Sequence, residues 1–356
     1  MTSYDRYFRE LWEGKRRTAG DKVLVALLIP CALIYSLVLR LRGFLYSRGI
    51  LRSFSLGAPV ISVGNLSVGG TGKTPMVVLI ARLLISRGKR VAVLSRGYGG
   101  SGGAIVRIVS DGSRILLPSS EAGDEPVLLA RTVPGLIVVT GADRYQAGLE
   151  AFKRFQPEIY LLDDGYQHLR LKRDLNILLL DARRPFGNGW TLPAGFLREP
   201  LSALRRADVI VYTRADRTAS CPMIPGIPVC RSSHRLSGVR PLSGGMLTPF
   251  SVFAGRRGVA CAGIADPDNF FAALSREGLG LTTTLTFSDH CRYDGTELAA
   301  IRQALKETGA DYLITTEKDA VKLVSFQELS IDVYAAVLDL DIIDPGILEL
   351  EIEKLL

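Results

Sequence analysis

The stretch SVGNLSVGGTGKTP, residues 62–75, decides the fold class. It matches the phosphate-binding pattern G-x-x-x-x-G-K-[ST] except at Ser67, where the pattern has glycine. Such a loop requires a strand before the glycines and a helix that begins at the lysine. Both are predicted: the β-branched run PVISV precedes it at 59–63, and the helical pattern at 73–88 has proline in its first turn and glycine at its end.

The chemistry of this loop suits a nucleotide. Its glycines allow successive backbone N–H groups to turn toward an anion, and the start of the helix adds partial positive charge. Lys73 can reach the β and γ phosphates of ATP, and the Thr74 hydroxyl can bind Mg²⁺. The candidate nucleotide-binding residues are Ser67, Val68, Gly69, Gly70, Thr71, Gly72, Lys73 and Thr74. The alternative is a glycine-rich turn followed by a surface lysine.

Short apolar runs alternate with helical patterns after residue 50, which predicts an α/β fold with a doubly wound parallel sheet of the P-loop NTPase kind. The runs lie at 59–63, 90–95, 136–140, 159–163, 175–181 and 208–212. We expect an N-terminal segment at 1–50, the P-loop domain at 51–220, a linker rich in Pro, Gly and Ser at 221–250, and a smaller α/β domain at 251–356.

The N-terminal segment contains an uncharged apolar run, Val23 to Leu39, which as a helix would be about 26 Å long. That length is at the lower limit for crossing a bilayer. Basic residues on both sides favour a helix held against anionic headgroups. They leave its orientation open, and a buried core helix is the alternative.

Paired carboxylates follow the run IYLLD: Asp163 and Asp164 stand at its end, before a glycine. The carboxyl edge of a parallel sheet is where ligands bind, so we expect this pair to help hold Mg²⁺. An ordinary turn after a strand is the alternative reading. Asp181, alone at the end of another run, is a second candidate.

Other motifs allow both functional and structural explanations. Asp124 and Glu125 stand at the start of a predicted helix, where acidic residues are also common as caps. His290 follows a predicted strand and could act as an acid or base, or be an exposed loop residue. Arg198 could contact a phosphate or form a surface ion pair. The motif TTEKDAVKL, 315–323, has the spacing of a helix capping box.

Composition narrows the possible partners. The 356 residues carry a net charge of +8 and are 47% hydrophobic, which suits a folded protein with anionic partners. The five cysteines are scattered without a C-x-x-C pair, which argues against a disulfide framework or a zinc knuckle and favours a reducing compartment. Aromatic and basic residues are not interleaved as in nucleic-acid binders.

Taken in order, the motifs resemble those of the tetraacyldisaccharide 4'-kinases of lipid A biosynthesis over nearly the whole chain. After the apolar N-terminal run they are GNLSVGGTGKTP, SRGYGG, GDEP, DDGYQHL, LPAGFLREP, FSDHCRY and TTEKDAVKL. The phosphate loop of that family also tends to lack the first glycine, so Ser67 agrees with it.

The resemblance implies an enzyme that transfers the γ-phosphate of ATP to the 4'-hydroxyl of a tetraacylated glucosamine disaccharide 1-phosphate. It implies ATP and Mg²⁺ as cofactors, and a place on the cytoplasmic face of a bacterial inner membrane, anchored by the N-terminal helix. The expected partners are the lipid substrate and an anionic membrane surface, with no nucleic acid and no obligate protein partner.

The resemblance also implies roles for individual residues. Asp124 would be the catalytic base, assisted by His290 from the smaller domain as the domains close over substrate. Lys73 would neutralise charge on the transferred group. The remaining assignments are Mg²⁺ binding by Thr74 and Asp163, completed by Asp164 or Glu125, and further contacts by Arg198, Gln167 and His168.

Two other functions remain open on the residues alone. A P-loop kinase for a soluble small molecule would need residues 23–39 to be a core helix. A nucleotide-switch protein would need a base-reading N-K-x-D loop, and the sequence offers only TRAD at 213–216.

Overall fold

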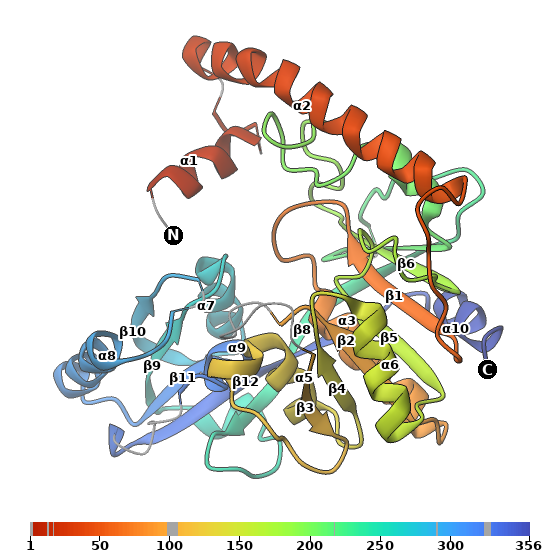
Figure 1. Ribbon diagram of the computed structural model, residues 1–356. Helices are drawn as coiled ribbons and strands as arrows, with labels where there is room; N and C mark the ends of the chain where they lie inside the picture. The colour runs from red at the N-terminus through yellow and green to blue at the C-terminus, as the bar shows by residue number, and fades with distance from the viewer. Residues whose placement is uncertain are drawn as a thin grey trace.

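The computed structural model describes residues 3–12, 14–16, 18–97, 106–216, 218–289, 291–323 and 329–356 (Figure 1). The strands are β1 Val60–Asn65, β2 Val91–Ser95, β3 Arg107–Asp111, β4 Ile137–Thr140, β5 Ile159–Asp163, β6 Leu175–Asp181, β7 Val209–Thr213, β8 Val229–Pro241, β9 Arg257–Ala262, β10 Gly280–Thr286, β11 Tyr312–Thr316 and β12 Asp332–Ile342. The helices are α1 Ser3–Trp12, α2 Ala19–Ser47, α3 Lys73–Ser86, α4 Ser119–Ala122, α5 Asp124–Thr132, α6 Arg144–Phe155, α7 Pro267–Arg276, α8 Gly295–Thr308, α9 Glu317–Ala320 and α10 Pro345–Glu353, with 3-10 helices η1 Leu201–Arg206 and η2 Phe250–Phe253.

The described strands form one 12-stranded sheet in the order β10-β9-β11-β12-β8-β7-β6-β1-β5-β2-β4-β3. Neighbours run parallel except at β3–β4 and β8–β12. Around β1, apolar residues of α3, α5 and α10 pack on one face of the sheet, and those of α6 and η1 pack on the other. Around β9, α8 covers one face and α7 the other. The prediction of a doubly wound sheet with a smaller α/β unit is therefore confirmed.

Strand β8 lies within segment 221–250, which composition predicts to be a linker. Its first residues pair in parallel with β7, and Ser232 to Pro241 pair antiparallel with β12. The segment is a linker only in part, because its middle is a strand that joins the two series of strands into one sheet. The remaining domain boundaries stay predictions.

Helix α2 stands apart from the sheet. It begins at Ala19 because Thr18 and Asp21 form a capping box, in which the side chain of each accepts a hydrogen bond from the backbone N–H of the other. By length and composition it could cross a membrane. Only Asp21 and Ala32 of α2 are buried, and many of its large apolar residues are exposed, up to 69% at Leu27. The packing therefore does not support the alternative of a core helix.

One side of α2 packs against the loop at residues 191–198 (Figure 1). Tyr35 Oη donates to the carbonyl of Arg198 (3.1 Å), and the hydroxyls of Ser36 and Thr191 are 2.8 Å apart. Thr191 Oγ1 also donates to the carbonyl of Ala32 at 3.0 Å. Polar contacts thus fix one side of α2 and leave its apolar side uncovered.

The carboxyl ends of β1 and β5 lie side by side, with Val63 in register with Asp163. Gly64 allows this approach, because a Cβ built there would lie 2.6 Å from Tyr166 Cβ and 2.8 Å from Tyr166 N. Tyr166 is buried, and its hydroxyl donates to the carbonyl of Ala203 (2.7 Å), so it cannot move away easily.

Strand β8 also reaches the loop at residues 67–74, which we call the phosphate loop. A Cβ at Gly72 would lie 2.7 Å from His234 Nε2, and Gly72 has a φ of +82°. Burial lowers the pKa of His234 to about 4, and Arg214 lowers it further while Asp181 opposes the shift. His234 is therefore neutral at pH 7 and packs against the start of α3.

We expect Gly64→Ala to lower the free energy of unfolding by about 1–3 kcal/mol, the usual cost of overpacking. The new methyl group would push Tyr166 and the segment after β5 out of place. Gly57→Ala is the matched control, because its Cβ would meet only Phe152 Cε2 at an ordinary 3.8 Å. Urea denaturation in detergent measures both variants, and equal stabilities would contradict the prediction.

We expect acid to destabilise the protein through His234. Its folded pKa, about 4, lies below the ordinary value of 6.5, so between these values the unfolded chain binds a proton that the folded chain does not. The loss at pH 4 is at most about 3 kcal/mol for this residue. His234→Gln should remove that part of the slope when the free energy of unfolding is measured between about pH 4.5 and 7.5. An unchanged slope would show that His234 titrates normally.

Candidate active site

The phosphate loop joins β1 to α3 and exposes its glycines. A Cβ at Gly69 or Gly70 would meet nothing within 4 Å, and Gly69 has a φ of +112°. Helix α3 begins at Lys73, directly after Gly72 in the left-handed conformation. The free backbone N–H groups at a helix start, together with the helix dipole, make this a candidate anion site.

Two of the eight predicted nucleotide-binding residues are held by the chain itself. Val68 N donates to the carbonyl of Phe196 (2.8 Å), and Ser67 forms a bridge with Leu197. Ser67 Oγ accepts a hydrogen bond from Asn65 Nδ2 (3.4 Å). The first part of the loop is thus pinned to the 191–198 loop, and the amides from Gly69 onward are the better candidates for phosphate contact.

Asp164 connects two cations at the floor of the site. Arg198 NH1 donates to both carboxylate oxygens of Asp164, at 3.1 and 2.8 Å, and Lys73 Nζ lies 3.7 Å from Oδ1. Burial opposes ionisation of Asp164, but Lys73 and Arg198 outweigh it and lower its pKa below the ordinary value. Asp164, predicted as a possible Mg²⁺ ligand, is therefore occupied with positioning Lys73 and Arg198.

Asp163 lies beside this cluster and is buried. Its Oδ2 accepts from Ser95 Oγ at 3.3 Å. Its Oδ1 has no hydrogen-bond partner among the described residues, and neither does Thr71 Oγ1 in the phosphate loop. Burial raises the pKa of Asp163 to about 7, and the charges of Glu125 and Asp164 add to the shift.

These features fit a bound divalent cation. The buried Oδ1 of Asp163 needs a partner, and neighbouring carboxylates that raise its pKa would favour a positive ion. Within the described ranges no group of three or more His, Cys, Asp and Glu side chains could hold a metal by itself. Mg²⁺ at phosphate sites commonly uses one or two protein ligands, completed by phosphate oxygens and water.

Asp124 is the first residue of α5 and faces the C-terminal part of the chain. Lys322 Nζ lies 3.7 Å from Asp124 Oδ2, and Ser119 Oγ donates to the carbonyl of Val321 (3.3 Å). Glu125, the next residue, is near enough to Asp163 to raise its pKa. The start of α5 therefore lies at the same sheet edge as the phosphate loop.

Two other predicted residues brace the site from outside. Gln167 Nε2 donates to the carbonyl of Asn65 (2.8 Å), and the carbonyl of Gln167 accepts from Arg42 of α2 (3.1 Å). Burial, helped by the charge of Arg144, lowers the pKa of His168 to about 4, so this histidine is neutral at pH 7. His290 lies outside the described residues, and its pairing with Asp124 stays a prediction.

Sequence reasoning missed several residues of the site. Lys73 Nζ donates to Asn65 Oδ1 (3.4 Å), and Arg144 lowers the pKa of both Asp163 and Asp164. Arg214 bridges the phosphate loop, because it donates to the carbonyl of Gly70 (2.9 Å) and pairs with Asp181 (2.5 Å). That ion pair gives Asp181 a structural role and makes it the less suited metal candidate. Asn65 could have been predicted as a site residue, because it is the last residue of β1. No sequence pattern marks Arg144 or Arg214 as a site residue.

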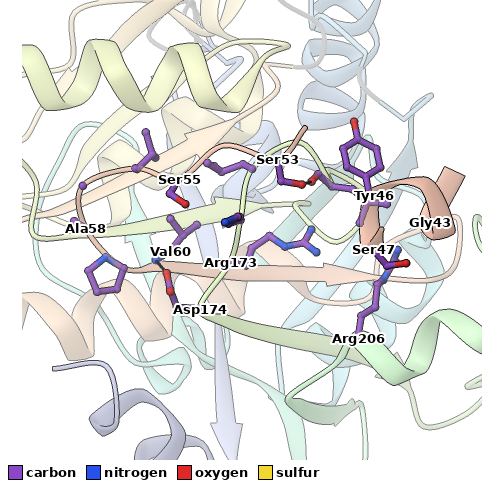
Figure 2. Close-up of a pocket in the computed structure, with 16 residues that line it drawn as sticks. Gly43, Tyr46, Ser47, Ser53, Ser55, Ala58, Val60, Arg173, Asp174 and Arg206 are labelled. Atoms are coloured by element: carbon purple, nitrogen blue, oxygen red, sulfur yellow. Dashed lines mark hydrogen bonds between the residues drawn. The ribbon is translucent and has the colours of Figure 1, made fainter. Parts of the chain in front are cut away.

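The cavity in Figure 2 lies elsewhere. It measures about 600 Å³ and is lined by Tyr46 of α2, Arg173, and residues 58–60 at the amino end of β1. The phosphate loop follows the opposite, carboxyl end of β1. This cavity therefore lies apart from the candidate nucleotide site.

Comparisons with known proteins agree with the geometry. The family model for tetraacyldisaccharide-1-P 4'-kinase matches residues 24–356. The tetraacyldisaccharide 4'-kinase of Geobacter metallireducens is 57% identical over 94% of this chain and 99% of the relative, and that of Geobacter sulfurreducens is 53% identical over 98% and 99%. The crystal structure of LpxK from Aquifex aeolicus in complex with ATP superposes with a TM-score of 0.81 and 35% identity, over 93% of this chain and 99% of the other. The chain belongs to the tetraacyldisaccharide-1-phosphate 4'-kinase family.

Proposed function

We propose that this 4'-kinase uses the phosphate loop for the terminal phosphates of ATP and works on a lipid disaccharide presented at a membrane surface. The observation that carries the proposal is that Lys73, at the end of the phosphate loop, and Arg198 both contact Asp164, while Gly69 and Gly70 of the loop have open space beside them. A carboxylate that holds two cations side by side prepares a positive surface for an oligophosphate before it binds. The ATP bound by the Aquifex relative supports this role.

The proposed reaction forms a bond between the 4'-oxygen and the γ-phosphorus, and breaks the bond from that phosphorus to the β,γ-bridging oxygen. The negative charge of the transferred group would be met by Lys73, Arg198 and the loop amides. The hydroxyl proton would pass to the Asp124 carboxylate. Because the transition state is loose, that transfer comes late and depends more on position than on basicity.

Mg²⁺ would be held by Asp163 and Thr74, with Glu125 completing the protein ligands; Asp164 is less suited because Arg198 and Lys73 already occupy it. When bound, the ion neutralises charge on the β and γ phosphates. Ser95 orients Asp163 through its hydrogen bond to Oδ2, and the unpartnered Oδ1 would be the oxygen that binds the ion.

The exposed face of α2 supports a membrane location, on the cytoplasmic side as the source of ATP requires. Leu33, Leu37 and Leu41, four residues apart, are exposed by 54%, 66% and 55%. Burial of that apolar area in lipid would be favourable by about 25 cal/mol per Å². Arg42 and Arg48 sit over the rings of Tyr46 and Phe44, a cationic rim that suits anionic headgroups.

The rival functions find less support. A kinase for a soluble substrate leaves the uncovered face of α2 unexplained. A nucleotide switch would need TRAD to read a base, but Asp216 instead accepts from Thr218 N (2.9 Å) and Oγ1 (2.7 Å) in a local turn.

We expect purified protein to transfer labelled γ-phosphate from ATP to monophosphorylated lipid A disaccharide in mixed micelles. Lys73→Ala should lower kcat by at least about 100-fold, as loss of a transition-state cation does. Asp124→Asn should lower it by about 100-fold or more, as loss of a general base does. Lys89→Ala is the matched control, because Lys89 follows the other end of α3 and pairs with Glu158 at the surface. Activity retained by Lys73→Ala would refute the site, and no product from wild type would refute the substrate.

We expect the protein to sediment with membranes and to require detergent for release. The triple variant Leu33→Glu, Leu37→Glu, Leu41→Glu should move to the soluble fraction, because each glutamate replaces an exposed leucine of α2. Met223→Glu, Met246→Glu, Leu350→Glu adds the same charge at exposed apolar positions away from α2 and should stay with the membrane. Quantitative blotting of the two fractions decides, and a soluble wild type would refute the membrane location.

A further inference from the structure

Arg214 joins the carboxyl ends of two strands to the phosphate loop. It follows β7 directly, its NH1 donates to Asp181 Oδ2 (2.5 Å), and its NH2 donates to the carbonyl of Gly70 (2.9 Å). Strands β7, β6 and β1 are parallel neighbours in the sheet, so their carboxyl ends lie at one edge. One guanidinium therefore connects the ends of β6 and β7 to the loop that follows β1.

Asp181 anchors this arginine. It is the last residue of β6, lies in register with Thr213, and its Oδ1 accepts from Arg183 N (3.1 Å). The side chains of Arg214 and Asp181 are only 26% and 13% exposed. Partial burial strengthens a hydrogen bond between charged groups, so the carboxylate holds the guanidinium firmly.

The backbone of Arg214 adopts a strained conformation. Its φ is +55°, in the left-handed region that residues other than glycine rarely occupy. Such strain persists where surrounding contacts fix the residue, and it is common at binding sites. An ion pair between β6 and β7 would need only one nitrogen of the guanidinium, so it leaves the contact with Gly70 unexplained.

The carbonyl that Arg214 binds belongs to the same peptide group as the N–H of Thr71. This peptide is trans, and the C=O and N–H of a planar trans peptide point in opposite directions. A donor that fixes the Gly70 oxygen on one side of the loop therefore directs the Thr71 N–H to the other side. None of the backbone N–H groups of residues 69–72 donates a hydrogen bond within the described part of the chain, so these donors remain for an anion.

We propose that Arg214 is a positioning residue for nucleotide binding: held by Asp181, it fixes the carbonyl of Gly70 and so directs the Thr71 N–H toward the ATP phosphates before they arrive. The inference rests on the proposed use of the phosphate loop for ATP. A loop whose amide is already oriented loses less conformational freedom on binding, which raises affinity. Because the contact serves the bound substrate and the transition state alike, its loss should act on KM for ATP rather than on kcat.

The test measures ATP affinity by isothermal titration calorimetry on the detergent-solubilised full-length protein, beside the kinetics of lipid phosphorylation. Arg214→Met should weaken ATP binding by about 10-fold and raise KM for ATP by a similar factor, with kcat within about threefold of wild type. AMP, which lacks the β and γ phosphates, should compete with ATP equally well in both proteins. An equal loss for AMP would place Arg214 at the nucleoside and overturn the inference.

A double variant separates orientation of the loop from charge. Arg214→Met leaves the Asp181 carboxylate without its cation, and that negative charge would itself repel ATP. Arg214→Met combined with Asp181→Asn has the net charge of wild type. If the contact with Gly70 sets the affinity, the double variant should bind ATP within about twofold of Arg214→Met. A return to wild-type affinity would show that Arg214 only neutralises Asp181, and the inference would fail.

Arg87→Met is the matched control. Arg87 follows the other end of α3, its side chain is 30% exposed, and it pairs with Glu353 at 3.0 Å. Its loss should leave ATP affinity unchanged. Thermal unfolding is followed for each variant, and Arg214→Gly replaces Arg214→Met if the latter does not fold, because glycine adopts the φ of residue 214 without strain.

The outcomes distinguish the inference from the proposed function. If Lys73→Ala weakens ATP binding but Arg214→Met binds ATP as tightly as wild type, the inference alone is refuted. If Lys73→Ala binds ATP as tightly as wild type, or wild type binds none, the phosphate loop is not the nucleotide site. The proposed function then fails, and the inference that rests on it fails as well.

Discussion

The site depends on one carboxylate that holds two cations. Asp164 accepts both bonds of Arg198 and lies within 3.7 Å of Lys73, and the pairing keeps two positive groups closer together than their repulsion would otherwise allow. Asp164 itself adopts a φ of +53°, a costly conformation for a residue with a side chain, directly after β5. The backbone strain and the ion cluster occur at the same residue, as is common where a binding site overrides local preference.

The parts that sequence predicted are those whose signals are local. The phosphate loop, its flanking strand and helix, and the acidic pair after β5 each follow from patterns within a few residues. Strand β8 was missed because Pro, Gly and Ser around it resemble a linker, and because its register with β12 shifts between Val337 and Leu338. Pairing with strands on both sides, and not the propensity of its own residues, makes it a strand.

The missed residues of the site share a different cause. Lys322 contacts Asp124 across almost two hundred residues of sequence, and Arg214 reaches Gly70 across more than one hundred. No spacing rule connects such pairs, because the connection exists only after the sheet has assembled. The spacing of Thr316 and Asp319 gives the first half of the motif TTEKDAVKL a structural explanation, because Thr316 caps α9, but no sequence pattern assigns a role to Lys322.

The continuous sheet brings the C-terminal part of the chain against the candidate site. His234 of β8 packs on Gly72, and Lys322 after α9 approaches Asp124, so the C-terminal part of the chain contacts both the phosphate loop and the candidate base. Helix α2 contacts the same site from the opposite direction, since Tyr35 binds the carbonyl of Arg198 and Arg42 binds that of Gln167. A shift of α2 would therefore displace the backbone of Arg198, whose side chain pairs with Asp164. On the proposed function, the helix that seats the enzyme on lipid also braces the cations that receive ATP, so the depth of α2 in the membrane would set the height at which the phosphoryl group is presented to the sugar.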